Sequence, residues 1–210
     1  MNCIKSEFKI VGINLILVSA AVVALFTLLA VFGGDLLHLS SLGFEVIFPF
    51  FAAIAVGEWG KTRADSNYDV ISAQSKSLFS WVFFRFFIVF ATVSLFALIS
   101  MVIVHAVRNE MPLWEIMCIY FPPAFLLASL SALFNICYKQ EHISTLICGV
   151  IWLLTMITKG LLRFPLAAYL YLFVRYAGIQ NGVWFVNKVV LMVISLFLWG
   201  IIYIICRREH

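Results

Sequence analysis

Residues 11–32 read VGINLILVSAAVVALFTLLAVF, a run of 22 residues without a charged side chain. A helix needs about 20 consecutive apolar residues to cross the hydrocarbon core of a bilayer, so this run predicts a membrane-spanning helix. It is longer than the apolar core of a secretory signal peptide, and further apolar runs follow it. Both features favour a retained first helix over a cleaved leader.

The composition of the whole chain agrees with that run. Of its 210 residues, 64% are hydrophobic and only 11% are charged, and the mean hydropathy is +1.09. Soluble domains are about 45–50% apolar and about 25% charged. The composition therefore excludes an ordinary soluble fold and a disordered chain. A chain of 210 residues has room for about six spans of 20 residues and little else, so a soluble catalytic domain is not expected.

The charges and cysteines also narrow the class of protein. The net charge is +4, from 14 basic and 10 acidic residues. There is no polybasic tract, so nucleic-acid binding is not expected, and the modest basic excess is typical of loops beside an anionic membrane surface. The five cysteines are widely spaced and form no C-x-x-C motif, which predicts small buried hydrophobic side chains and no disulfide framework.

Five further apolar runs predict an all-α polytopic membrane protein with six transmembrane helices in one domain. The predicted spans are residues 11–32, 42–57, 78–104, 116–136, 143–157 and 183–206. Residues 1–10 alternate apolar and charged side chains at helical spacing, which predicts a short helix on the membrane surface. The Pro122-Pro123 pair inside the fourth span should kink or break that helix.

Residues 159–182, between the fifth and sixth spans, are apolar and aromatic but are interrupted by Arg163, Pro165, Arg175 and Gly178. This stretch is too polar for a lipid-facing span and too apolar for an exposed loop. It predicts a re-entrant or interfacial hairpin before the last helix.

The distribution of basic residues predicts the orientation. With both termini in the cytoplasm, eight of the 14 Lys and Arg residues lie on the inner side and five on the outer side, and Arg85 lies within the membrane. Cytoplasmic loops carry the excess of Lys and Arg, so both termini are expected inside. The expected location is a cell membrane.

The longest polar stretch, residues 58–77, reads EWGKTRADSNYDVISAQSKS and lies on the predicted inner side between the second and third spans. It holds six of the 24 charged residues of the chain. Its mixture of apolar and charged residues predicts a short amphipathic helix that docks into a groove of a partner. A solvated connecting loop is the alternative, because most connections are polar and exposed.

This stretch resembles the coupling loop of ABC transporter permeases of the type-2 export class. Glu58 matches the Glu that ends the second helix in that family. Asp69-Val70-Ile71-Ser72 match its apolar run, and Ser75-Lys76-Ser77 match the turn before the third helix. Ala73-Gln74 stand where the family has a Pro. The organisation of the whole chain is also similar, from the N-terminal surface helix to the hairpin before the sixth span.

The resemblance implies a permease that pairs with a second permease subunit, identical or homologous, and binds a separate ATPase subunit, one on each permease. ATP and Mg²⁺ would be held by the ATPase, and this chain has no G-x-x-x-x-G-K-[S/T] phosphate loop of its own and needs no cofactor. The substrate path would run between the two permeases, lined by the first, second and fifth helices. Small permeases of this kind are similar to those of bacteriocin export or immunity systems. This similarity implies that the substrate is a peptide or a lipid-like molecule, and an antimicrobial peptide is one candidate substrate.

Under this interpretation the ATPase docks on the polar stretch. Tyr68, Val70 and Ile71 would supply apolar contact, with Asp69 beside them, while Glu58 and Arg63 would fix the ends of the docking helix.

Two other functions remain open. An intramembrane peptidase that processes a signal or bacteriocin peptide would need a nucleophile and a base near one membrane face, and Cys137 and His142 lie five residues apart at the predicted inner turn. Their placement by chance is the simpler interpretation. A non-transporting membrane immunity protein is the other alternative. A metal site of His142 with Cys148 is not expected, because it offers only two ligands.

Three charged residues lie inside predicted spans: Glu45, Arg85 and Lys188. Charged residues within the membrane are candidates for a functional role. Each is also close enough to the end of its span for its side chain to reach the membrane interface, which is the simpler interpretation.

Overall fold

A computed structural model describes residues 2–32, 43–65, 68–69, 78–108, 112–179 and 182–208. In these ranges the fold is all-helical and contains no β-strand. The elements are α1 (Asn2–Phe32), the π-helical turn η1 (Gly43–Ile47), α3 (Phe48–Trp59), α5 (Leu78–Arg108), α6 (Leu113–Cys137), α7 (Ile143–Ile157), the 3₁₀ turn η2 (Thr158–Arg163), α8 (Pro165–Leu170) and α9 (Val183–Arg208).

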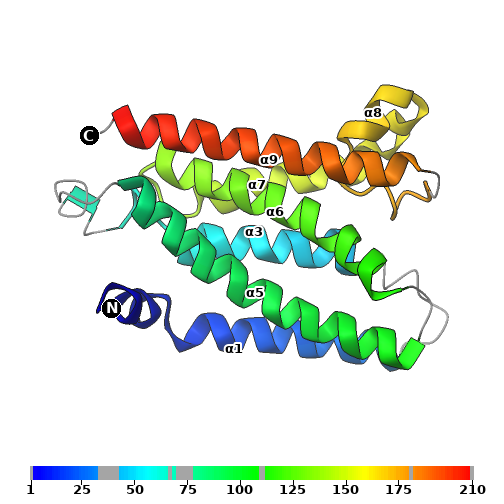
Figure 1. The fold of residues 1–210 in the computed structure, drawn as a ribbon, viewed down its shortest axis with the longest axis horizontal. Coiled ribbons are helices and arrows are strands. Elements are labelled where there is room, and N and C mark those ends of the chain that lie inside the picture. The colour runs from blue at the N-terminus through cyan, green and yellow to red at the C-terminus, as the bar shows by residue number, and fades with distance from the viewer. Residues whose placement is uncertain are drawn as a thin grey trace.

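The long helices run side by side along one direction of the bundle (Figure 1). The N-terminal end of α1 and the C-terminal end of α9 lie at the same end of the bundle, which we call the termini end. The turn between α6 and α7 also lies there. The short helix α8 lies at the opposite end, beside the start of α9, and we call this the α8 end.

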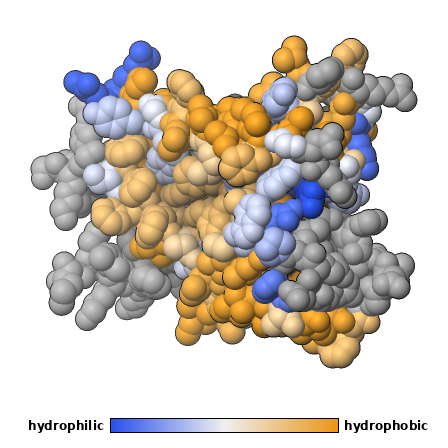
Figure 2. All heavy atoms as spheres, turned by 45° about the vertical axis from the view of Figure 1, so that its right-hand side comes forward, coloured by the Kyte–Doolittle hydropathy of each residue, from blue (hydrophilic) through white to orange (hydrophobic). Residues whose placement is uncertain are grey.

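Five of the described helices contain stretches long and apolar enough to cross a membrane. These stretches are Ile13–Phe32, Leu78–Val107, Leu113–Cys137, Ile143–Gly160 and Val183–Arg208. The face in Figure 2 shows mainly hydrophobic residues, and exposed apolar side chains such as Phe197 (73% exposed) are frequent on α1, α5, α7 and α9. A soluble monomer rarely exposes so much apolar surface, so the fold is that of a helical membrane protein.

The remaining crossing of the bundle is made by η1 and α3, which together cover 17 residues from Gly43 to Trp59. This element contacts α1, α5, α6 and α7, and most of the residues of α3 are buried. The residues in the middle of this element are apolar, and they are covered by other helices of the protein. A helix that is hydrophobic on all sides is expected at such a position.

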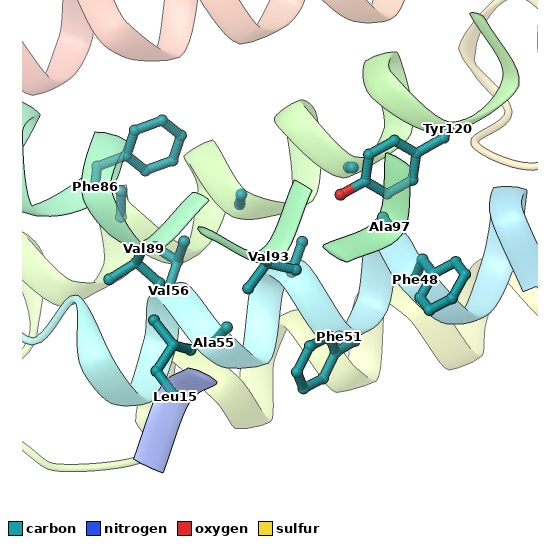
Figure 3. Packing of buried hydrophobic residues seen from close by; sticks show 14 of the residues in the cluster. Leu15, Phe48, Phe51, Ala55, Val56, Phe86, Val89, Val93, Ala97 and Tyr120 are labelled. Carbon is teal, nitrogen blue, oxygen red and sulfur yellow. The ribbon is translucent and has the colours of Figure 1, made fainter. Parts of the chain in front are cut away.

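The main core lies where α1, α3, α5 and α6 meet (Figure 3). Phe48 from α3 and Tyr120 from α6 are completely buried there, as are Val89 and Ala97 from α5. Small residues on α3, among them Ala52 and Ala55, let neighbouring helices approach closely, as is common in membrane bundles.

Polar side chains within the apolar interior form hydrogen bonds between helices. Such pairs are Thr27 Oγ1 with Ser100 Oγ at 2.7 Å, Ser94 Oγ with Tyr120 Oη at 3.1 Å, and Trp199 Nε1 with Ser129 Oγ at 3.1 Å. They join α1 to α5, α5 to α6 and α6 to α9. A buried hydroxyl without a partner is costly, so each pair also helps to fix how its two helices align.

One expectation about helix continuity needs correction. The Pro122-Pro123 pair does not break α6, which is one helix from Leu113 to Cys137. Both prolines are buried, so packing on neighbouring helices compensates for the missing amide hydrogen bonds. The helix expected over residues 1–10 is part of α1, which runs from Asn2 to Phe32. Its first turns bend away from the direction of the rest (Figure 1).

Candidate functional site

Polar and charged side chains gather at both ends of the bundle. The termini-end cluster surrounds Glu58, Arg63 and Arg85. The α8-end cluster surrounds Glu45 and Lys188. Each cluster contains residues that the sequence analysis selected, and each connects an irregular part of the chain to the helices.

At the termini end, Asn135 of α6 connects three helices. Its Nδ2 donates to the carbonyl oxygens of Val56 at 3.0 Å and Gly60 at 3.2 Å, and its Oδ1 accepts from Ser144 Oγ at 2.7 Å. The last carbonyl groups of a helix have no partner within that helix. Asn135 therefore satisfies the end of α3 and attaches it to the end of α6 and the start of α7.

Glu58 lies beyond the apolar part of α3 and binds the start of α7. Its Oε1 accepts from His142 Nδ1 and from Thr145 Oγ1, each at 2.8 Å. Lys61 Nζ lies 3.7 Å from Glu58 Oε2 and 3.1 Å from Glu141 Oε2. Partial burial of Glu58 raises its pKa, but the hydrogen bonds from His142 and Thr145 and the nearby positive charges outweigh that effect, and the pKa lies below its ordinary value of 4.5.

A lowered carboxyl pKa makes stability depend on pH in a defined direction. Ionised Glu58 stabilises the fold at pH values above the ordinary pKa of 4.5, and this contribution is lost as the pH falls below 4.5 through the folded-state pKa. We expect thermal unfolding midpoints of the wild type to fall over that range, and to fall less for Glu58→Gln. Equal slopes for the two proteins would show that this carboxylate makes no such contribution.

Arg63 attaches the polar segment to the end of α6. Its backbone N–H donates to the Asn135 carbonyl at 3.1 Å, and its Nη1 lies 3.4 Å from the carbonyl oxygens of both Ile136 and Cys137. A cation is favourable at the C-terminus of a helix, where carbonyl groups are exposed. Glu58 and Arg63, which we expected to fix the ends of a docking helix, thus hold the beginning of the segment on α6 and α7.

Arg85, from the first turns of α5, is buried, with 3% of its side chain exposed. Its Nη1 donates to Asp65 Oδ2 at 2.7 Å and to the Lys61 carbonyl, and its guanidinium carbon lies 4.3 Å from the ring centroid of Trp81. The sequence analysis selected Arg85 but missed Asp65 as its partner. The signal was available, because Asp65 is a carboxylate in the polar loop at the same end of this span.

The other predicted docking residues are placed only in part. Tyr68 is partly buried and packs against the main core, whereas Asp69 is exposed. Val70 and Ile71 lie outside the described residues. The segment is therefore known from Gly60 to Asp65 and at residues 68–69, where it stays close to the helices.

At the α8 end, Glu45 of η1 and Lys188 of α9 form an ion pair, with Lys188 Nζ 2.5 Å from Glu45 Oε1. Both side chains are buried within the protein, at 0% and 3% exposed. The carboxylate also accepts the backbone N–H groups of Arg175 at 3.1 Å and Tyr176. A carboxylate with three donors is well compensated for its burial.

The chain between α8 and α9 leaves helical geometry at Tyr171. Backbone carbonyl groups of this region accept hydrogen bonds from side chains of α9. Asn187 Nδ2 donates to the carbonyl oxygens of Ala168, Tyr169 and Tyr171, and Lys188 Nζ lies 3.3 Å from that of Leu172. Non-helical backbone in an apolar environment is tolerated only where other protein groups form hydrogen bonds with its N–H and C=O groups. Asn187 was not selected from the sequence, although it stands beside Lys188 in an otherwise apolar span.

A second ion pair joins this segment to α6. Arg175 Nη2 lies 2.6 Å from Glu115 Oε1, and its guanidinium carbon is 5.8 Å from the ring centroid of Trp184. Residues 171–174 are buried in a second hydrophobic cluster with α6, α7 and α9. The α8-end cluster therefore holds residues 171–176 firmly on the bundle.

These contacts are the basis on which a function can be assigned. No family model, curated protein or solved structure matches this chain.

The geometry around His142 does not resemble a peptidase site. Its Nδ1 binds Glu58, and its Nε2 lies 3.8 Å from Glu141 Oε2, so both ring nitrogens face carboxylates. A general base must direct one nitrogen at the nucleophile. Cys137 ends α6 and is exposed.

Residues 55–62, AVGEWGKT, differ from a phosphate loop only by Ala at the first position. A phosphate loop uses free backbone N–H groups after a strand. Here residues 55–59 belong to α3, and the Gly60 N–H donates to the Val56 carbonyl at 2.9 Å. A Cβ at position 60 would lie 2.4 Å from that same oxygen, so Gly60 is required to end α3 and not to bind a phosphate.

Metal binding has no support in the described ranges, where no group of three or more His, Cys, Asp or Glu side chains could hold an ion.

Proposed function

We propose that the chain is the permease subunit of an ABC exporter. It would cross the bacterial cytoplasmic membrane six times, with both termini in the cytoplasm, and move a peptide or lipid-like substrate. ATP would be hydrolysed on a separate subunit. The observation that supports this most is the attachment of the end of α3, together with the polar segment after it, to three other helices.

Each attachment uses a different side chain. Arg63 binds the end of α6, Glu58 binds the start of α7, and Arg85 of α5 binds Asp65. A merely connecting loop needs no buried arginine to hold it. A partner that moves this segment would displace the ends of α3, α5, α6 and α7 together, which is what a coupling element has to do.

The exposed turn between α6 and α7 extends this surface. Residues 137–142 are all exposed, and the turn is joined to the segment by the Lys61–Glu141 and Glu58–His142 pairs. We infer that the ATPase contacts both the segment and the turn. Asp69, which is exposed on the segment, belongs to the same docking surface.

The exposure of the helices bears on the expected substrate path. η1 with α3 is mostly buried among the other helices, so it does not line a path between two copies, although the second helix was expected to do so. The share of buried residues is smallest for the stretch that contains α7, at 11%, and is 28% for both α1 and α9. We infer that α1 and α7, the other two helices expected to line the path, offer apolar faces to a second permease subunit.

The alternatives are weaker on this geometry. A peptidase would need a histidine nitrogen directed at Cys137, whereas both nitrogens of His142 face carboxylates. A non-transporting immunity protein would not need a coupling element, and the experiment below separates it from a permease.

The test is to express the tagged chain with its genomic neighbours, purify it in mild detergent, and measure co-purified ATPase and Mg²⁺-dependent phosphate release. Asp69→Lys reverses an exposed charge on the docking surface, so we expect roughly tenfold less ATPase to be retained. Lys159→Glu is the control for a charge reversal at an exposed position of the α8 end, where Lys159 Nζ lies 5.4 Å from the ring centroid of Tyr176.

Two outcomes would contradict the proposal at different levels. If no ATPase co-purifies with the wild type, the exporter assignment fails and the immunity alternative is favoured. If Asp69→Lys and Lys159→Glu retain ATPase equally well, the docking surface is wrong while the exporter assignment stands.

A further inference from the structure

The outward face of α9 carries a shallow apolar groove of about 440 Å³. The groove is lined by Val193, Leu196, Phe197, Gly200, Ile201 and Ile204. Gly200 creates the depression, because a Cβ at this position would have no neighbour within 4 Å. The large side chains around it stand out on both sides.

The length of the groove matches one leaflet of a bilayer. From residue 193 to residue 204, α9 rises about 16 Å at 1.5 Å per residue. Half of the hydrocarbon core of a bilayer is about 15 Å. An extended acyl chain in one leaflet therefore fits along the groove.

The groove leads to a pair of positive charges at the termini end. Arg207 and Arg208 form the last turn of α9 and are exposed. Arg208 follows Phe197, Ile201 and Ile204 at helical spacings of eleven, seven and four residues, so it lies on the groove side of the helix. A phosphate at the membrane surface would meet a guanidinium that can bind it through two hydrogen bonds.

We propose that this groove is a binding site for an anionic phospholipid. One acyl chain lies over Gly200 between Phe197 and Ile204, and the phosphate binds Arg208 and Arg207. Anionic lipids are attracted to basic residues at the cytoplasmic surface, and here an apolar groove adds shape to that attraction. The proposal does not depend on whether the chain binds an ATPase.

A second copy of the chain is a less suitable occupant. A glycine among large side chains also permits close packing of two helices. However, in a symmetric pair of α9 helices both copies would have the same orientation in the membrane. Arg207 and Arg208 of each copy would then lie beside those of the other, and like charges would repel. An acidic headgroup neutralises them instead.

Native mass spectrometry of the delipidated protein, titrated with phosphatidylglycerol and with phosphatidylcholine, tests the site. We expect the wild type to bind phosphatidylglycerol roughly tenfold more tightly or better. Arg207→Gln with Arg208→Gln should remove this preference. Gly200→Leu fills the groove and should weaken binding of both lipids. All three positions face outward, so these variants should fold.

Ala21→Leu is the matched control, because it enlarges an exposed apolar residue of α1 that does not line this groove. It should bind both lipids like the wild type. The proposal is overturned if the wild type does not distinguish the two lipids, or if Gly200→Leu binds as the wild type does. It is also overturned if Gly200→Leu converts a dimer to a monomer without changing lipid binding, because the groove would then belong to a second copy.

Discussion

Lys188→Met is expected to destabilise the protein by about 3–5 kcal/mol, because it leaves the fully buried Glu45 carboxylate without its ammonium partner. Proteins of this size are stable by only about 5–15 kcal/mol, so the loss is a large share of the total and the thermal unfolding midpoint should fall markedly. The backbone N–H groups of Arg175 and Tyr176 would still donate to Glu45. They carry only partial charges and do not neutralise it.

Two double variants separate the charge of Glu45 from its role as an acceptor. Arg175 and Tyr176 donate to different oxygens of Glu45. Glu45→Gln with Lys188→Met removes both charges and keeps a carbonyl oxygen for one of these two N–H groups, so it should recover part of the stability. Glu45→Leu with Lys188→Met also removes both charges, but leaves those two N–H groups without their acceptor. It should stay less stable by about 1–3 kcal/mol.

The measurements are thermal unfolding in detergent and amide hydrogen exchange of residues 171–179. Exchange in the Arg175–Tyr176 region should be faster with Leu at position 45 than with Gln, while α6 stays protected in both. If Lys188→Met is as stable as the wild type, the ion pair does not stabilise the fold. If the Gln and Leu double variants are equal, the carboxylate does not hold this segment through its backbone.

The second large effect is expected for Arg85→Met, which removes the buried guanidinium that binds Asp65 and the Lys61 carbonyl. Breaking a buried ion pair from one side costs about 3–5 kcal/mol. The loss should be local to the termini end, because Arg85 connects the polar segment to α5. Trypsin should therefore cleave faster after Lys61 and Arg63.

Arg85→Lys is the matched control. A lysine keeps the charge, but its ammonium stacks less well than a guanidinium on Trp81, so an intermediate effect is expected. A double-mutant cycle with Asp65→Asn should give a coupling energy of about 1–3 kcal/mol. Additive effects of the two substitutions would show that Arg85 and Asp65 act independently.

The positions of the long helices could be predicted because the apolar runs are long and bounded by charges. The predicted span at residues 143–157 coincides with α7, and the span at 78–104 lies within α5. The helix ends differ by a few residues, since hydropathy measures where lipid begins and not where a helix stops. The continuity of α6 through Pro122-Pro123 could not be predicted, because it depends on buried packing with its neighbours.

The partners of the embedded charges were harder to predict. Glu45 and Lys188 are 143 residues apart, and nothing local in either run indicates the other. Their shared role depends on the irregular backbone at Arg175 and Tyr176, which only the folded chain brings to them. Arg85 and Asp65 are a simpler case, because a polar loop beside a span end is the natural place for such a partner.

The separation of 143 residues between Glu45 and Lys188 also has a consequence for biogenesis. Glu45 emerges from the ribosome early, and its counter-charge is made only in the last helix. At about 5–20 residues per second, the carboxylate waits on the order of ten seconds before Lys188 is synthesised. Chains that stop before α9 therefore carry the Glu45 carboxylate in η1 without its ammonium partner.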